Sequence, residues 1–111
     1  MDGPPSDECA HFKLAIDLLT KPWAGHILRT LQGGPLRFNE LAARIGGIGE
    51  KVLSARLKEL EGQGLLVRRV LPSMPVKVEY ELTCKGRGFQ QVVEAIIRWG
   101  CQLAETAPEA G

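Results

Sequence analysis

A helix expected over residues 49–64 constrains the fold of this chain more than any other segment. Leu53, Leu57 and Leu60 follow the i, i+4, i+7 spacing of a helix with one apolar stripe, and glycines follow directly. A shorter amphipathic segment at 38–45 precedes it across a glycine-rich turn. The two segments predict a helix-turn-helix unit whose leucine stripe is buried.

The face opposite the leucines has a composition found in helices that read DNA. It carries Lys51, Ser54, Ala55 and Lys58, two cations around two small side chains. Such a helix can lie in the major groove, with its lysines near phosphates. A helix that faces only water has the same pattern, so both interpretations stay open at this point.

Net charge is only +1 over 111 residues, but the charge is unevenly distributed. Residues 37–87 contain ten Lys/Arg against six Asp/Glu, whereas both ends of the chain are acidic. The basic middle coincides with the two-helix unit, which favours an anionic partner there. A solvated surface would also account for an excess of this size.

A β-hairpin is expected after the second of these helices. Residues 65–71 form one strand, and residues 76–82 alternate strictly between apolar and charged side chains. The loop between them is flanked by prolines and can project from the body. A hairpin at this place is the wing of a winged helix, which can contact the DNA backbone, with Lys77 at its edge.

Helices at both ends of the chain have more apolar residues than one buried face needs. The first is expected over 9–19, and the last runs from Thr83, as N-cap, to about Ala104. Pro22 is expected in the first turn of the helix that buries Trp23. Burial of the surplus against a second copy predicts a homodimer. The predicted interface residues are Phe12, Ile16, Phe89, Val93, Ile96, Trp99 and Leu103.

The predicted fold class is mainly α with a small β-hairpin wing (α+β), a winged helix-turn-helix that dimerises through its first and last helices. It occupies residues 9–104, between a flexible arm at 1–8 and a tail at 105–111. No apolar run is long enough for a membrane span, and the acidic N-terminus is unlike a signal peptide, so a cytoplasmic location without membrane contact is expected. Three cysteines without framework spacing fit reduced thiols.

No cofactor, metal site or enzymatic activity is predicted. Cys9 and His11 are close in sequence, but their spacing to the other cysteines and His26 matches no closed zinc pattern. A thiol enzyme needs a Cys-x-x-Cys motif or a base paired with the nucleophile, and neither is visible in the sequence.

Short motifs from residue 9 to about 100 together carry a family resemblance. They include Cys9, Trp23, Ile27-Leu28-Arg29, Gly34-Pro35-Leu36-Arg37-Phe38-Asn39-Glu40-Leu41, Lys51-Val52-Leu53, Arg56-Leu57-Lys58-Glu59-Leu60, Pro75-Val76-Lys77-Val78-Glu79-Tyr80, Leu82-Thr83, Gly86 and Trp99. In these residues the chain resembles the HxlR family of bacterial transcriptional regulators, which are DNA-binding proteins related to the MarR winged-helix proteins. The resemblance implies a homodimer that regulates nearby genes.

The resemblance also implies which residues contact DNA. Arg56 is ambiguous, because it lies near the leucine side of the helix and either braces a phosphate or pairs internally with Glu59 or Glu40. Glu50 departs from the family pattern, since a carboxylate in this turn repels phosphates and suits a groove only when it accepts from cytosine. The full predicted set is Arg37, Asn39, Gly49, Glu50, Lys51, Ser54, Ala55, Arg56, Lys58 and Lys77.

Cys9 is the candidate sensor thiol, because some members of the family respond to oxidants or electrophiles through a cysteine near the first helix. A helix N-terminus favours the reactive thiolate, whereas Asp7 and Glu8 oppose it. An inert, partly buried thiol is the alternative. Cys84 and Cys101 are weaker candidates, and the sequence establishes no pairing between cysteines.

The leading hypothesis is a dimeric, sequence-specific regulator, most simply a repressor, that binds a near-palindromic operator in double-stranded DNA. The alternative is a winged-helix protein-interaction module that has lost DNA binding. Glu50 and the modest net charge favour this alternative. Titration with DNA separates the two.

Overall fold

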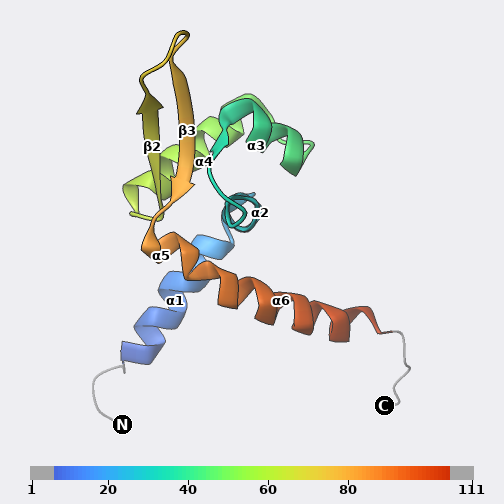
Figure 1. Ribbon diagram of the computed structural model, residues 1–111. Helices are drawn as coiled ribbons and strands as arrows, with labels where there is room; N and C mark the ends of the chain where they lie inside the picture. Colours follow the sequence, from blue (N-terminus) through green and yellow to red (C-terminus); the bar gives the residue numbers. More distant parts are fainter. Residues whose placement is uncertain (1–6, 106–111) are drawn as a thin grey trace, which may run out of the picture.

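The computed structural model describes residues 7–105 and shows a helical body from which a hairpin projects (Figure 1). Helices α1 and α6 diverge on the side away from the hairpin tip. The elements are α1 (Asp7–Leu19), α2 (Ala24–Leu31), β1 (Leu36–Arg37), α3 (Phe38–Ile45), α4 (Glu50–Gly62), β2 (Leu66–Leu71), β3 (Lys77–Leu82), α5 (Cys84–Arg87) and α6 (Phe89–Ala104).

The sheet is antiparallel and has the strand order β1-β3-β2. In the hairpin, Leu66 pairs with Leu82 and Leu71 pairs with Lys77, which confirms the predicted strands to within one residue. Residues 36–37 form a short third strand, in which Leu36 pairs with Tyr80. Leu36 is buried, so β1 fixes the hairpin to the helical core.

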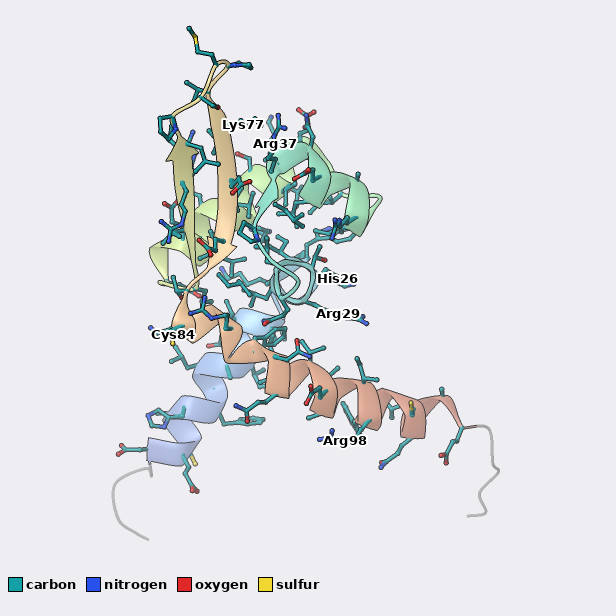
Figure 2. All side chains as sticks on the ribbon, in the orientation of Figure 1. His26, Arg29, Arg37, Lys77, Cys84 and Arg98 are labelled. Atoms are coloured by element: carbon teal, nitrogen blue, oxygen red, sulfur yellow. The ribbon has the colours of Figure 1, made fainter. Side chains whose placement is uncertain are left out.

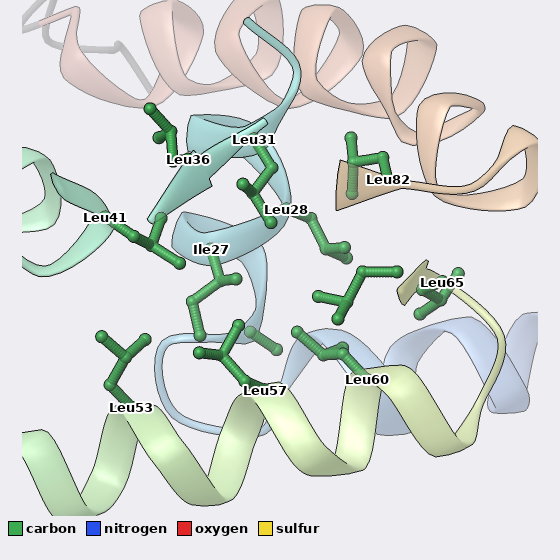
Figure 3. Close-up of a cluster of buried hydrophobic side chains, with 12 residues drawn as sticks. Ile27, Leu28, Leu31, Leu36, Leu41, Leu53, Leu57, Leu60, Leu65 and Leu82 are labelled. Atoms are coloured by element: carbon green, nitrogen blue, oxygen red, sulfur yellow. The ribbon is translucent and has the colours of Figure 1, made fainter. Parts of the chain in front are cut away.

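The core lies between α2 and α4, as Figure 3 shows. The predicted leucine stripe is confirmed, because the side chains of Leu53, Leu57 and Leu60 are all at most 2% exposed. Ile27 and Leu28 of α2 pack in the same cluster. Each fully buried aliphatic side chain stabilises the fold by about 1.5–3 kcal/mol, so this stripe fixes which face of α4 is turned outward.

The ends of the predicted domain shift in the structure. Helix α1 begins at Asp7, so two residues of the arm predicted at 1–8 are helical. Asp7 and Glu8 lie in the first turn, where acidic side chains favour the helix dipole. The rest of the arm, 1–6, lies outside the described residues. Of the predicted tail, Glu105 follows α6 and residues 106–111 are not described.

The start of one helix and the continuity of another were predicted incorrectly. Helix α2 begins at Ala24, not at Pro22, because Trp23 adopts a left-handed conformation (φ 72°) that a helix cannot include. Thr83 is the predicted N-cap, and its Oγ1 accepts from the amide of Gly86 at 3.2 Å. The helix that it caps ends after one turn, however, and α6 starts afresh at Phe89.

Candidate nucleic-acid interface

The outward face of α4 is the centre of the candidate interface. Lys51, Ser54, Ala55 and Lys58 are all exposed, because burial of the leucine stripe turns them to the opposite side. Within residues 7–105, neither lysine forms a salt bridge. Both ammonium groups are therefore available for phosphates.

The N-terminus of α4 is capped by backbone only. Gly49 is the N-cap, has extended backbone angles and provides no side-chain hydrogen bond. Glu50 is exposed in the first turn. Val52 is 38% exposed on the same helix and is not among the predicted residues, because an apolar side chain carries no sequence signal for contact with DNA. An exposed valine here can contact a thymine methyl group.

The start of α3 lies beside the sheet. Arg37 is its N-cap, and the backbone N–H of Arg37 donates to Oε1 of Glu40 at 2.8 Å. Its side chain and that of Asn39 are exposed. Arg37 pairs with Glu79 in the sheet, two residues from Lys77, and Figure 2 shows Lys77 on the hairpin and Arg37 next to it. The geometry thus brings the predicted residues of α3 and the wing to neighbouring positions.

The wing carries further exposed groups. Met74 at the hairpin tip is 98% exposed, and the loop is braced by a hydrogen bond of 2.6 Å from Ser73 Oγ to the carbonyl of Pro75. Arg69 forms an ion pair with Glu81, whereas Arg68 is exposed and forms no salt bridge within the described part of the chain. Arg68 was missed because strand periodicity does not separate a solvated cation from a binding one.

Arg56 differs from the other cations of α4. Its side chain is 19% exposed, its Nε donates to the carbonyl of Pro22 at 2.9 Å, and its Nη1 lies 3.1 Å from Oε1 of Glu59. Of the two alternatives, the structure favours the internal one, with Glu59 rather than Glu40 as the partner. Arg56 thus differs from Lys51 and Lys58, and its place among the predicted DNA contacts stays a prediction.

The outer faces of α1 and α6 are apolar. Five of the seven predicted interface residues are 41–69% exposed: Phe12, Ile16, Ile96, Trp99 and Leu103. The other two are less accessible in the single chain: Val93 is 7% exposed, and Phe89 packs against the core. A groove of about 400 Å³ lies between α6 and the residues that connect α1 to α2, and Trp23, Phe89 and Val93 are among its lining residues.

The three thiols lie on different helices and are exposed: Cys9 on α1, Cys84 at the start of α5 (Figure 2) and Cys101 on α6. In the described region, no three His, Cys, Asp or Glu side chains are grouped as metal ligands. His26 instead lies beside Trp23, with ring centroids 5.4 Å apart. No helix within residues 7–105 has the length and apolar character needed to cross a membrane.

The order α3, turn, α4 and hairpin defines a winged helix-turn-helix protein, flanked by long first and last helices. The model of the HxlR-like helix-turn-helix family matches residues 18–108, and the chain belongs to this family. YodB, an HTH-type transcriptional regulator of Bacillus subtilis, is 43% identical over 97 residues, which are 87% of each chain.

Solved structures agree with this assignment. The reduced form of YodB superimposes with a TM-score of 0.80 at 40% identity and covers 97% of this chain and 100% of its own. A MarR-family structure from Enterococcus faecalis has a TM-score of 0.80 at 29% identity and covers 94% of each chain. The redox regulator HypR in its reduced form has a TM-score of 0.75 at 32% identity and covers 82% of this chain and 90% of its own. This protein is therefore a transcriptional regulator of HxlR/MarR type and not an enzyme.

Proposed function

We propose that the chain acts as a homodimer that binds a near-palindromic operator in double-stranded DNA and represses the adjacent gene in the cytoplasm. One observation carries the proposal: α4 buries its leucines and exposes on the opposite face, beside a projecting hairpin, two lysines that form no salt bridge with any residue of 7–105. Lys51 and Lys58 contact phosphates in the major groove, and Ser54 and Ala55 allow close approach to the bases.

The apolar faces of α1 and α6 support the dimer. Phe12, Trp99 and Leu103 are each more than 60% exposed in the single chain. Large apolar side chains with this much exposure, on both of these helices, are typical of an interface between subunits. A two-fold axis through these helices presents two copies of α4 to successive major grooves, about 34 Å apart.

Cys9 is the proposed sensor. It is exposed on α1, one of the two helices assigned to the dimer. Its thiolate sulfur adds to a ring carbon of an electrophile such as a quinone; a C–S bond forms, and the ring is reduced to the hydroquinone level as it takes up a proton. Likeness to YodB, whose solved forms include diamide-treated and quinone-bound proteins, and to HypR in reduced and oxidised forms supports this assignment.

The test is a titration of the reduced protein with DNA from upstream of its own gene and with a scrambled fragment, each at two salt concentrations. We expect preference for the native fragment and affinity that falls steeply with salt, because each phosphate contact releases counterions. If the two fragments bind equally, the titration is repeated with fragments from the rest of the gene's genomic neighbourhood. Equal, weak binding to all of them would contradict the proposal and favour a protein-interaction module.

A further inference from the structure

A hydrogen bond joins the recognition helix to the segment between α1 and α2. Nε of Arg56 donates to the carbonyl of Pro22 at 2.9 Å, and Nη1 lies 3.1 Å from Oε1 of Glu59 on the same helix. The Arg56 side chain is 19% exposed, although Ala55 before it and Lys58 two residues after it are exposed to solvent. A cation on the proposed DNA-reading helix therefore contacts the protein itself.

The backbone at Trp23 presents this carbonyl to α4. The carbonyls on either side of Pro22 accept main-chain N–H groups: Lys21 O from Ala24 at 3.2 Å, and Trp23 O from Ile27 at 3.0 Å. The left-handed turn at Trp23 (φ 72°) lies between them, a conformation that is strained for a bulky residue and is retained only where its surroundings hold it. Packing of Trp23 against the core provides this support.

The contact adds a direction that the core does not provide. The leucine stripe of α4 holds the helix by apolar burial, which is not directional and permits small rotations of the helix about its axis. A hydrogen bond depends on both distance and angle. Because Glu59 also binds the guanidinium, the Arg56 side chain has few other orientations. A displacement of the Pro22 carbonyl therefore changes the position of Arg56 and, with it, the orientation of α4.

We propose that Arg56 is a positioning residue that sets the orientation of α4 and couples it to α1 through the Pro22 carbonyl. This inference rests on the proposed DNA binding. Residues 20–23 continue directly from α1, which carries Cys9 and the exposed Phe12, so a displacement of α1 moves the acceptor of Arg56. The Pro22–Arg56 hydrogen bond thus links α1, which carries the proposed sensor and dimer residues, to the helix proposed to read DNA.

DNA titrations of Arg56→Gln, Arg56→Lys and Lys58→Gln separate positioning from phosphate contact. For Arg56→Gln we expect the preference for native over scrambled DNA to fall roughly five- to tenfold, because a charge-assisted hydrogen bond is lost. The salt dependence of DNA affinity stays unchanged in Arg56→Gln, whereas Lys58→Gln lowers the slope of log affinity against log salt by about one. Arg56→Lys keeps the charge but cannot reach both acceptors, and gives an intermediate loss of preference.

Two results would overturn the inference. A salt slope lowered by about one in Arg56→Gln, with unchanged preference, would make Arg56 a phosphate contact. Unchanged preference in both Arg56 variants would show that α4 needs no such anchor. If Arg56→Gln does not fold, Arg56→Lys decides by the same criteria.

A measurement without DNA keeps failure of this inference separate from failure of the proposed function. The chain has two tryptophans, so Trp99→Phe leaves Trp23 as the sole reporter of the segment that holds the Pro22 carbonyl. In that background, acrylamide quenching should rise with Arg56→Gln and stay constant with Lys58→Gln. Constant quenching in both would overturn the coupling. Raised quenching in a protein that prefers no operator fragment would overturn the role in DNA reading while the contact itself stands.

Discussion

At the scale of single residues, Lys51 and Lys58 are expected to contribute to DNA affinity but not to the stability of the fold. Both are exposed, so replacement of either by Gln should change the free energy of unfolding by at most about 0.5 kcal/mol. Binding to native and scrambled DNA should weaken together, and the slope of log affinity against log salt should fall by about one per lysine. Fluorescence anisotropy at several salt concentrations measures both effects.

Lys85→Gln is the matched control, because Lys85 is also exposed but lies on α5, away from the face of α4. Its affinity and salt slope should equal those of the unmodified protein. Full affinity in both α4 variants would refute the assignment of this face to the major groove.

Cys9→Ser tests the sensor at the same scale. Serine is nearly isosteric but does not add to a quinone at neutral pH, so DNA binding in the reduced state should be retained and release by a quinone should be lost. Cys84→Ser and Cys101→Ser serve as controls, because both thiols are also exposed. Anisotropy of the protein–DNA complex during quinone titration measures release, and normal release from the Cys9 variant would exclude this thiol.

Residue periodicity predicted the positions that helical geometry alone determines. Leu53 and Lys58 fall on opposite faces of any helix that includes both, and the structure confirms this. Arg56, Phe89 and Val93 could not be placed in the same way. Their surroundings come from segments distant in sequence, namely Pro22 for Arg56 and the helical core for Phe89.

At the scale of elements, the sequence predicted which helices and strands exist better than where they start. The left-handed turn at Trp23 has no local signal, because bulky residues rarely adopt it. The close packing of α5 likewise has no local signal: a Cβ on Gly86 would lie 2.1 Å from the carbonyl oxygen of Leu65, a residue distant in sequence. Thr83 joins the start of α5 to the turn after α4, since its Oγ1 donates to the carbonyl of Gly64 at 2.6 Å.

Gly86→Ala should therefore destabilise the fold. The added methyl group meets backbone rather than a flexible side chain, and such overpacking costs about 1–3 kcal/mol. Chemical denaturation measures the change. Gly25→Ala is the control, because no atom lies within 4 Å of its added Cβ on α2, and there the same substitution should be neutral or stabilising by up to about 1 kcal/mol. Equal stability of the two variants would mean that α5 does not pack closely against Leu65.

At the scale of the whole molecule, α1 and α6 diverge from the body (Figure 1), and both helices expose apolar side chains. The core between α2 and α4 is complete without the outer parts of these two helices. Trp99 and Leu103 are 61% and 66% exposed although α6 is long and regular. The fold of one chain therefore does not use these side chains, and a second copy is the partner that accounts for them most simply.

Leu103→Glu tests this arrangement. In a single chain the new carboxylate faces water, so the fold should be retained, whereas in a two-fold dimer it would be buried without a partner at a cost of roughly 3 kcal/mol or more. The dimer should weaken at least about 100-fold, and the mass measured by sedimentation should approach that of one chain, 12.1 kDa. Gln102→Glu is the control, because it adds the same charge one position away, at a residue outside the predicted interface. DNA affinity should fall with dissociation, since one α4 then reads a single half-site. A Leu103→Glu protein that sediments as a dimer and binds the operator normally would place the interface elsewhere.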